Sequence, residues 1–565
     1  MAFNLWKGSK LNNEEKSSSL NWMFHWSLPQ YKPRVAQQKI LNRIIWAIEN
    51  GYKNIILEAG TGIGKSAIAV TLANMYEDSF ILTMTKQLQN QYRHDFPSLV
   101  EIKGSGNYKC RIKGNCDFCI KKELEEKRCP DCLFIDAFNR AKKADNVITN
   151  YDFFYLGIVP NLDGRKLLIL DEAHNLERKM LHLSSFALDR ERIMIKYGID
   201  IFDCVINGEK TVAKLKRETN YWVDLCHKLS ESCKEKIRDI DISSDTQSSL
   251  DDFMNNPEIF EERQELKEDI DYYNKIARRL SSHELIIDLP KYSDIKKDEL
   301  YNNGLQAEFK PYSVTDETAK LLNMAEICIF LTGTLGDKKK FCQWNNINPD
   351  ETYHIYQKSP FELENRPIKL DFAGRLSGDN KGRPNWRSEK AIDKIKEILD
   401  AHSNEKGVIH TSSTEQAYWI CENLKDYDLI VVEGDERNRI INDFTQSDRK
   451  SVLIGASLKD GVDFKGDICR FQIMFKMPYP QLNELVQYRK RQDRSWYFYQ
   501  AVMALMQAYG RGIRDMDDYC TMYIIDSSFK RLFDYNRKFF NQYFEEAVLA
   551  ARKEMKARNR KKSND

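Results

Sequence analysis

A glycine-rich turn between an apolar run and a helical pattern is the first segment whose residues could do chemistry. Residues 55–66 read IILEAGTGIGKS, and the helical pattern AIAVTLANMY follows. Glycines let successive backbone N–H groups face a phosphate, the Lys65 ammonium can reach the β- and γ-phosphates, and the Ser66 hydroxyl can bind Mg²⁺. The segment predicts a P loop that binds ATP or GTP through Gly60, Thr61, Gly62, Ile63, Gly64, Lys65 and Ser66.

A pair of carboxylates follows a second apolar run, in the segment KLLILDEAHNL. A buried parallel strand presents the residues after its carboxyl end at the edge of the sheet. There Asp171 can hold the water shell of Mg²⁺, and Glu172 can activate the water that attacks the γ-phosphate. The segment therefore predicts hydrolysis of the nucleotide, and His174, which completes the D-E-A-H pattern, belongs to the same expected site.

Two other segments offer polar side chains to the same nucleotide. YKPRVAQQKIL places Gln37 and Arg34 shortly before the P-loop strand, where an adenine-reading element would lie. Far along the chain, QAYGRGIR places Gln507, Arg511 and Arg514 at i, i+4 and i+7, on one face of a helix. Two such arginines can stabilise the charge that develops on a transferred phosphoryl group. A solvated basic helix face is the alternative interpretation.

The segment CRIKGNCDFCIKKELEEKRCPDC contains five cysteines, at positions 110, 116, 119, 129 and 132. The last four have the C-x2-C…C-x2-C spacing of a structural zinc site, but a four-ligand site leaves Cys110 without a role. The first residues, MAFNLWKGSKLNNEEKSSSL, lack the pattern of a secretory signal, so we expect a reducing compartment in which cysteines are thiols or metal ligands.

The composition limits the class of protein. At 565 residues the chain is too long for one hydrophobic core, so three or four domains are expected. Charged residues make up 30% of the chain, and no apolar run reaches the about 18 residues that would span a bilayer, so we expect no membrane association. The net charge is only +2, so any affinity for nucleic acid must come from local basic patches.

The elements that would position these groups form two α/β halves. The second half follows ICIFLTGTLG and contains the strand patterns KGVIHTSS and SVLIGAS. In the first half, ILTMTKQLQNQY places Thr85, Lys86 and Gln91 at a strand end and helix start, suited to a nucleic-acid backbone or simply to an ordinary helix cap.

The residues between the DEAH and TGTL segments show helical periodicity and little strand pattern. We expect a helical hairpin with a polar turn at DISSDTQSSLDDF, and we expect Cys226 and Cys233 in its core and not as ligands. The apolar positions that carry this prediction are Val212, Leu215, Trp222, Cys226, Leu229, Cys233 and Ile237, and then Leu266, Ile270, Tyr273 and Leu280. The basic end, AARKEMKARNRKKSND, is expected to be a disordered solvated tail.

The order of these motifs resembles that of the superfamily-two helicases. The motifs are AGTGIGKS, TKQLQNQ, DEAH, TGTL, HTSS, KDGVDFKG and QAYGRGIR, and the cysteine-rich segment narrows the resemblance to the XPD/DinG family. KGSGNYKC resembles the residues that precede the first of the cysteines that bind an iron-sulfur cluster in this family. DGVDFKG…KMPYP resembles the family's EGVDF and LPFP segment. In this chain Asp460 stands for the family's Glu, Tyr479 for its Phe, and Cys520 for its usual Gly.

The resemblance implies an α/β fold of two RecA-like parallel-sheet domains, the first interrupted by an iron-sulfur cluster insert and a helical Arch-like insert. The implied division assigns the first RecA-like domain to residues 1–105, 136–180 and 311–337, the cluster insert to 106–135, the Arch-like insert to 181–310, the second RecA-like domain to 338–550 and the basic tail to 551–565. It also adds Asp463 to the nucleotide site.

The resemblance further implies that four of the five cysteines hold a [4Fe–4S] cluster. We assign Cys110, Cys116, Cys119 and Cys132 as its ligands and Cys129 as spare, although the proline after Cys129 favours that residue as the last ligand. Zinc on the last four cysteines remains the alternative.

The implied activity is that of an ATP- and Mg²⁺-dependent DNA helicase that moves 5′-to-3′ on single-stranded DNA and unwinds forked or 5′-tailed duplexes. A monomer is expected, acting on DNA in the cytoplasm or encoded by a virus and acting in its host. The alternative is a zinc-bearing ATPase switch, stimulated by nucleic acid, that binds or remodels without separating strands.

Overall fold

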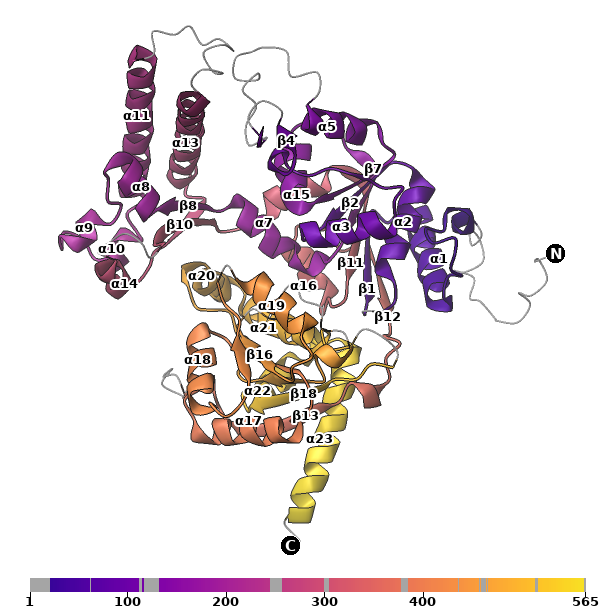
Figure 1. Ribbon diagram of the computed structural model, residues 1–565. Coiled ribbons are helices and arrows are strands. Elements are labelled where there is room, and N and C mark those ends of the chain that lie inside the picture. Colours follow the sequence, from indigo (N-terminus) through magenta and orange to yellow (C-terminus); the bar gives the residue numbers. More distant parts are fainter. Residues whose placement is uncertain are drawn as a thin grey trace.

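Two parallel-sheet domains and a largely helical body make up the molecule in the computed structural model (Figure 1). The structure describes residues 21–60, 62–110, 114–115, 132–243, 257–298, 304–377, 385–434, 436–456, 458, 464, 466–513 and 517–562. In that part of the chain no helix is long and apolar enough to cross a membrane.

The first domain is built on a seven-stranded sheet in which all neighbours are parallel. Buried apolar side chains on both faces of its strands explain the continuous apolar runs in the sequence. Helices α1 (Val35–Glu49) and α2 (Lys65–Tyr76) pack on one face. The strand order is β12 (Thr352–Gln357), β1 (Asn54–Ala59), β11 (Ala325–Thr332), β7 (Arg165–Leu170), β2 (Ser79–Thr83), β6 (Asn146–Asn150) and β3 (Val100–Glu101).

The strand order brings the predicted motifs together. Strands β1, β11 and β7 are neighbours, and because parallel strands end at the same edge, the P loop, the TGTL segment and the DEAH segment lie side by side there. Strand β12 pairs with β1, so the first sheet continues to Gln357, past the expected boundary at residue 337. The boundary at residue 337 is therefore wrong: β12 follows the TGTL motif in the sequence, but it pairs with β1 and belongs to the first domain.

The second domain contains a six-stranded sheet, again with every neighbour parallel. This sheet and the first one confirm the predicted α/β class. Helix α17 (Glu389–Ala401) and α18 (Thr414–Asn423) pack on one face, and α21 (Arg494–Tyr509) and α22 (Phe529–Asn536) pack on the other. The strand order is β13 (Ile368–Gly374), β18 (Thr521–Asp526), β17 (Phe471–Met474), β14 (Gly407–His410), β16 (Val452–Gly455) and β15 (Leu429–Val431).

The helical body leaves the first domain through α7 (Leu176–Ser184) and returns through α15 (Thr315–Leu322). The predicted helices are present: α11 (Thr219–Ser243) and α13 (Pro257–Ser281) lie side by side (Figure 1). Cys226 and Cys233 are fully buried, as expected for core residues. Val212 and Leu215 lie instead on the short helix α10 (Val212–Leu215). Most of the predicted polar turn is outside the described residues.

An antiparallel sheet supports these helices, which the sequence periodicity did not predict. Its strands are β8 (Phe186–Asp189), β10 (Gln306–Pro311) and β9 (Leu285–Asp288), in that order. The fully buried rings of Trp222 and Phe309 meet edge to face, with centroids 5.4 Å apart, where α11 packs on the sheet. The strands have only four to six residues each, too few for their alternation to stand out from the helical pattern around them.

The described ends of the cysteine-rich segment lie in or next to short regular elements. Cys110 ends the two-residue strand β4 (Lys109–Cys110), which pairs with β5 (Gly114–Asn115), and Cys132 directly precedes α5 (Leu133–Lys143). Cys116, Cys119 and Cys129 lie outside the described residues. Among the described residues there is no group of three or more His, Cys, Asp or Glu side chains that could hold a metal.

The basic end of the chain is a helix and not the disordered tail that we expected. Helix α23 (Gln542–Lys562) packs against the second domain with Val548 and Ala551 buried. Glu554 accepts hydrogen bonds from Lys369 of β13, at 2.8 Å, and from Arg558 one turn later, at 2.5 Å. The apolar face of this helix begins upstream of the basic run, which is why the composition of the run alone was misleading.

Candidate active site

The P loop has the backbone conformation that phosphate binding requires. Gly62 and Gly64 have φ angles of +80° and +85°, which residues with a side chain rarely adopt, and Gly64 caps the N-terminus of α2. The Lys65 ammonium donates a hydrogen bond to the carbonyl of Ala59 at 3.0 Å, so it lies over the loop where phosphates would bind. Gly60, Ile63 and Ser66 are in the expected positions, and Thr61 is outside the described residues.

The Asp171 carboxylate is buried at the carboxyl end of β7. It accepts a hydrogen bond from the Tyr92 hydroxyl at 2.8 Å and another from the Glu172 N–H at 2.9 Å. Burial and the adjacent Glu172 charge raise the pKa of Asp171 to about 6, against the opposing influence of Lys65 and Tyr92. A divalent cation at this point would favour the ionised form. Sequence reasoning missed Tyr92, which lies on α3 (Lys86–Asp95), far from the DEAH motif.

His174 connects the DEAH motif to the TGTL motif. Its Nε2 lies 2.8 Å from Asn175 Nδ2, and its Nδ1 lies 2.9 Å from Thr332 Oγ1. Because the Asn175 Nδ2 group can only donate, His174 Nε2 must accept, and these partners assign the ring proton to Nδ1. Burial lowers the pKa of His174 to about 4, so the ring is neutral at pH 7 and joins the two motifs by hydrogen bonding.

Gln37 lies against the P loop. Its Oε1 accepts from the Arg34 N–H at 2.8 Å, and its Nε2 donates to the Ile63 carbonyl at 3.0 Å. The Arg34 guanidinium donates to the Gly62 carbonyl at 2.5 Å. A side chain at Gly64 would place its Cβ 2.5 Å from Gln37 Nε2. In this structure the two residues therefore support the loop that would hold the phosphates.

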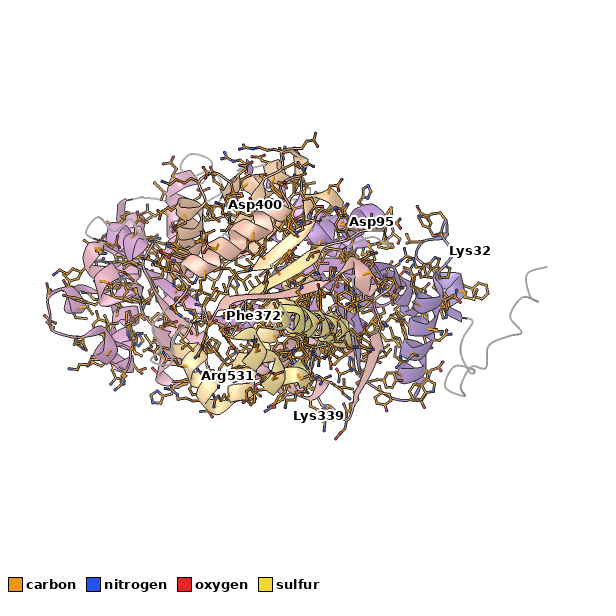
Figure 2. All side chains as sticks on the ribbon, turned by 90° about the horizontal axis from the view of Figure 1, so that it is seen from below. Lys32, Asp95, Lys339, Phe372, Asp400 and Arg531 are labelled. Carbon is orange, nitrogen blue, oxygen red and sulfur yellow. The ribbon has the colours of Figure 1, made fainter. Side chains whose placement is uncertain are left out.

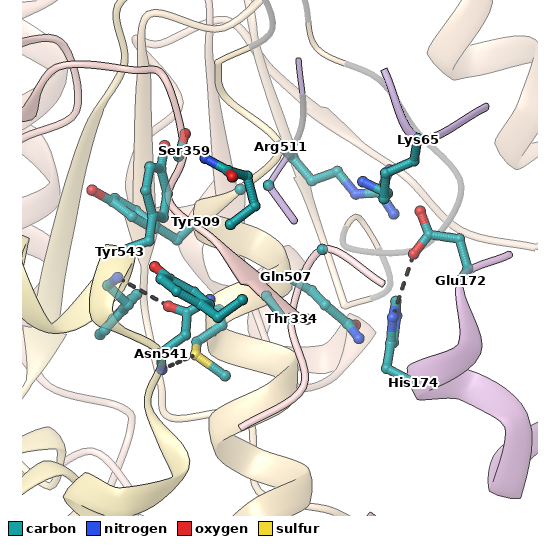
Figure 3. A pocket seen from close by; sticks show the side chains of 17 residues that line it. Lys65, Glu172, His174, Thr334, Ser359, Gln507, Tyr509, Arg511, Asn541 and Tyr543 are labelled. Atoms are coloured by element: carbon teal, nitrogen blue, oxygen red, sulfur yellow. Dashed lines mark hydrogen bonds and ion pairs between the residues drawn. The ribbon is translucent and has the colours of Figure 1, made fainter. Parts of the chain in front are cut away.

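The second domain closes the site from the opposite side. A cleft of about 750 Å³ lies between the domains, and Lys65, Glu172 and His174 line it together with Gln507 and Arg511. Figure 3 shows the Arg511 side chain extended toward Lys65 and Glu172. Further lining residues that sequence reasoning missed come from the end of β12 and the segment after it, and from the region around the start of α23; they are Tyr356, Gln357, Ser359, Asn541, Tyr543 and Phe544.

The predicted helical face of Gln507, Arg511 and Arg514 is only partly correct. Helix α21 ends at Tyr509, so Gln507 is helical whereas Arg511 lies in the turn that follows. Arg514 and Asp463 are outside the described residues. Thr85, one of the three polar residues singled out at a strand end and helix start, accepts a hydrogen bond from the Leu88 N–H at 3.2 Å and caps α3.

Comparisons with known proteins match both domains. Residues 30–198 match the model of the type III restriction enzyme res subunit, and residues 388–546 match the helicase C-terminal domain. YoaA of Escherichia coli, named an ATP-dependent DNA helicase, is 19% identical over 600 residues, covering 89% of this chain and 92% of that protein. YoaA of Haemophilus influenzae is 22% identical over 635 residues, covering 90% and 93%.

Solved structures agree on the fold. A structure of an XPD helicase superposes on 90% of this chain and 98% of its own, with a TM-score of 0.58 at 17% identity. A structure of apo XPD covers 89% and 99%, with a TM-score of 0.55 at 17% identity. The chain is a superfamily-two helicase of the XPD/DinG type.

The side chains of this helicase fit Mg²⁺ and ATP at the interdomain cleft. The P loop supplies N–H donors and an ammonium group for phosphates, and Asp171 supplies a buried carboxylate for a hydrated Mg²⁺. Bound Mg²⁺ would neutralise charge on the phosphate oxygens. Glu172 could accept a proton from water, and Lys65 and Arg511, which line the cleft from two domains, could bring positive charge to a transferred phosphoryl group.

A second cleft of the helicase, called here the basic cleft, lies within the second domain. Four cations line it: Arg375, Lys490, Arg494 and Arg531, the last of these on α22 (Figure 2). The rings of Tyr479 and Tyr497 stack with centroids 5.5 Å apart and planes at 8°, beside Phe498 and Tyr535. No carboxylate is among the described residues that line this cleft.

Proposed function

We propose that this helicase is an ATP-dependent DNA helicase that translocates 5′-to-3′ on single-stranded DNA and couples ATP hydrolysis to duplex unwinding. The observation that carries the proposal is the placement of α21. This helix contributes Arg494, Tyr497 and Phe498 to the basic cleft near its start and Gln507 to the ATP cleft near its end.

The hydrolytic step requires groups from both domains. Glu172 orients the attacking water and takes its proton, and Lys65 holds the β- and γ-phosphates. Arg511 enters from the second domain, so the full charge set exists only while the domains are together. Hydrolysis and product release remove the γ-phosphate that Lys65 and Arg511 would both contact, and the two domains can then separate.

The basic cleft suits a single strand. Proteins that bind single-stranded nucleic acid without sequence preference combine cations along the backbone with aromatic rings on which bases stack. The basic cleft contains both, and no carboxylate is among its described lining residues. Because the net charge of the whole chain is only +2, this local concentration would supply much of the affinity for DNA. The curated relatives named above support DNA as the nucleic acid.

The two inserts complete the proposal. Residues 106–135 would form an iron-sulfur insert, and residues 181–310 an Arch-like insert beside the strand. Cys110, Cys116, Cys119 and Cys132 would hold the [4Fe–4S] cluster, a thiolate set that suits iron; the described ends of the segment, Cys110 and Cys132, are anchored to β4 and α5. The cluster would supply folding energy to a segment too small for its own core.

Unwinding assays on protein purified without oxygen test the direction. Duplexes with a 5′ tail and forked duplexes should be unwound with ATP and Mg²⁺, and a duplex with only a 3′ tail should stay intact. Glu172→Gln serves as the inactive control on each substrate. Unwinding of the 3′-tailed duplex alone would overturn the polarity. Stimulated hydrolysis without unwinding, together with bound zinc and no iron, would favour the ATPase-switch alternative.

A further inference from the structure

A separate groove, called here the outer groove, lies between the helical body and the second domain. Its volume, including the solvent space at its open side, is about 1320 Å³. One wall consists of α10, the residues after it and the segment from β9 into α14 (Tyr292–Lys297), and the other wall is α20 (Glu484–Gln492). Lys216 donates to Glu484 at 3.1 Å, and the rings of Tyr312 and Tyr488 meet with centroids 4.6 Å apart, so two direct contacts join the walls.

The outer groove carries uncompensated positive charge. Its described lining includes Lys216, Arg217, Lys291 and Arg491, against the single carboxylate of Glu484. That carboxylate is already paired with Lys216. Within the described part of the chain, Arg217, Lys291 and Arg491 form no ion pair, and all three are exposed. Three cations therefore face solvent around one groove.

Aromatic rings accompany these cations. Tyr292 exposes 52% of its surface and Tyr312 exposes 36%; both line the groove, and Tyr292 directly follows Lys291 in the chain. An exposed ring next to an unpaired cation can stack on a base while the cation meets the adjoining phosphate. The combination of groups is the same as in the basic cleft, but it lies on different elements.

Helix α20 connects the outer groove to the basic cleft. Lys490 lines the basic cleft and its neighbour Arg491 lines the outer groove, whereas Arg489 is buried between them and pairs with Glu177 of the first domain. Successive side chains on a helix point about 100° apart, so one turn of α20 can serve both surfaces. The two positively charged surfaces are therefore adjacent across a single helix.

We propose that the outer groove is a second binding subsite for single-stranded DNA, occupied by the part of the strand that extends beyond the basic cleft. This inference rests on the proposed function, because it assumes that the basic cleft holds the same strand. It adds that the phosphates meet Arg217, Lys291 and Arg491 and that a base stacks on Tyr292. An acidic protein partner is the competing occupant, and the test below separates the two.

The test compares binding of short and long strands to the full chain. Fluorescence anisotropy would be measured with oligothymidylates of about 6 and about 20 nucleotides. A single binding site for single-stranded DNA commonly covers about 4–16 nucleotides, so only the longer strand should reach a second subsite. The variants are the double substitution Arg217→Gln with Lys291→Gln, and Tyr292→Ala alone. The matched control is Lys296→Gln, which removes an exposed charge from α14 outside the groove lining.

The double variant should bind the short oligonucleotide with unchanged affinity. Its affinity for the long oligonucleotide should fall roughly tenfold or more at about 0.1 M salt. Each lost phosphate contact should also reduce the slope of log K against log salt by about 0.7, so the slope for the long strand should fall by about 1.4. Tyr292→Ala should weaken the long strand at least about fivefold with the slope unchanged. Lys296→Gln should behave as wild type.

Three results would overturn the inference. One is an unchanged salt slope for the long strand in the double variant. Another is equal loss for both lengths, which would point to general misfolding or to a role in the basic cleft. The third is a long-strand affinity that Tyr292→Ala leaves intact. If the wild-type protein binds neither oligonucleotide, the proposed function itself fails, which is a different outcome from failure of the outer groove alone.

Discussion

The indole Nε1 of Trp496 donates a hydrogen bond to the carboxylate of Glu177, 3.0 Å away, across the boundary between the two parallel-sheet domains. Gln500 Nε2 lies 3.4 Å from the same oxygen, and Arg489 pairs with the other. Glu177 follows the DEAH motif in the chain, and Trp496 and Gln500 lie on α21. The helix that reaches both clefts is therefore held to the segment that follows Asp171 and Glu172 in the chain.

We expect Trp496→Phe to lower the rate of DNA-stimulated hydrolysis roughly tenfold with little change in ATP affinity. A hydrogen bond to a charged group contributes about 1.5–3 kcal/mol, and its loss would shift the domains away from the arrangement in which Arg511 reaches the phosphate. Steady-state kinetics would show the fall in kcat. In a double-mutant cycle with Glu177→Gln the effects should not add; simple additivity would contradict the proposed coupling.

Lys65→Ala and Glu172→Gln should each reduce hydrolysis by orders of magnitude, because positioning and electrostatics supply nearly all of phosphoryl-transfer catalysis. The two variants should differ in binding: Lys65→Ala loses the nucleotide, whereas Glu172→Gln retains it. Calorimetric titration with ATP and Mg²⁺ separates them. Normal turnover in either variant would refute the assigned role.

Arg511→Ala should retain ATP binding and lose most DNA-stimulated hydrolysis, because its side chain enters the cleft from the second domain and acts chiefly in the transition state. Arg514→Ala is expected to behave in the same way. Arg511→Lys keeps the charge without the planar fork and should recover only part of the rate. A collapse of ATP affinity in Arg511→Ala would instead make that arginine a ground-state ligand.

Cys110→Ser and Cys132→Ser should each lose iron and unwinding while keeping appreciable ATP hydrolysis, because cluster loss should disorder only the small insert. Cys129→Ser should keep all three properties. Iron analysis of protein purified without oxygen provides the measurement, with the half-buried Cys421→Ser as a control in the second domain. Loss of iron from Cys129→Ser, with retention in Cys116→Ser or Cys119→Ser, would show that the ligand assignment is wrong.

The nucleotide site could be predicted because its main parts are local in sequence. A strand, a glycine turn and a helix follow one another in the P loop, and Asp171 follows its strand directly, so the backbone conformation carries the chemistry. The fold class followed from the same strands. The helices α11 and α13 were predictable from the regular three- and four-residue spacing of their apolar residues in the sequence.

Contacts between distant segments were beyond the reach of sequence patterns. Tyr92 meets Asp171 only because α3 folds under the edge of the sheet, and nothing in its own segment indicates a catalytic neighbour. Strand β12 joins the first sheet by pairing with β1, which a boundary drawn after the TGTL motif could not reveal. The basic cleft gathers cations from several elements of the second domain, so no short basic motif marks it.

The length of helix α21 sets the distance between the interdomain cleft and the basic cleft. Its 16 residues correspond to about 24 Å at 1.5 Å per residue, and it lines the basic cleft near one end and the interdomain cleft near the other. A continuous helix of this length bends little, so it acts as a stiff spacer. If the second domain rotates during the hydrolytic cycle, this helix would therefore move a DNA strand bound in the basic cleft, and the helix itself would deform little.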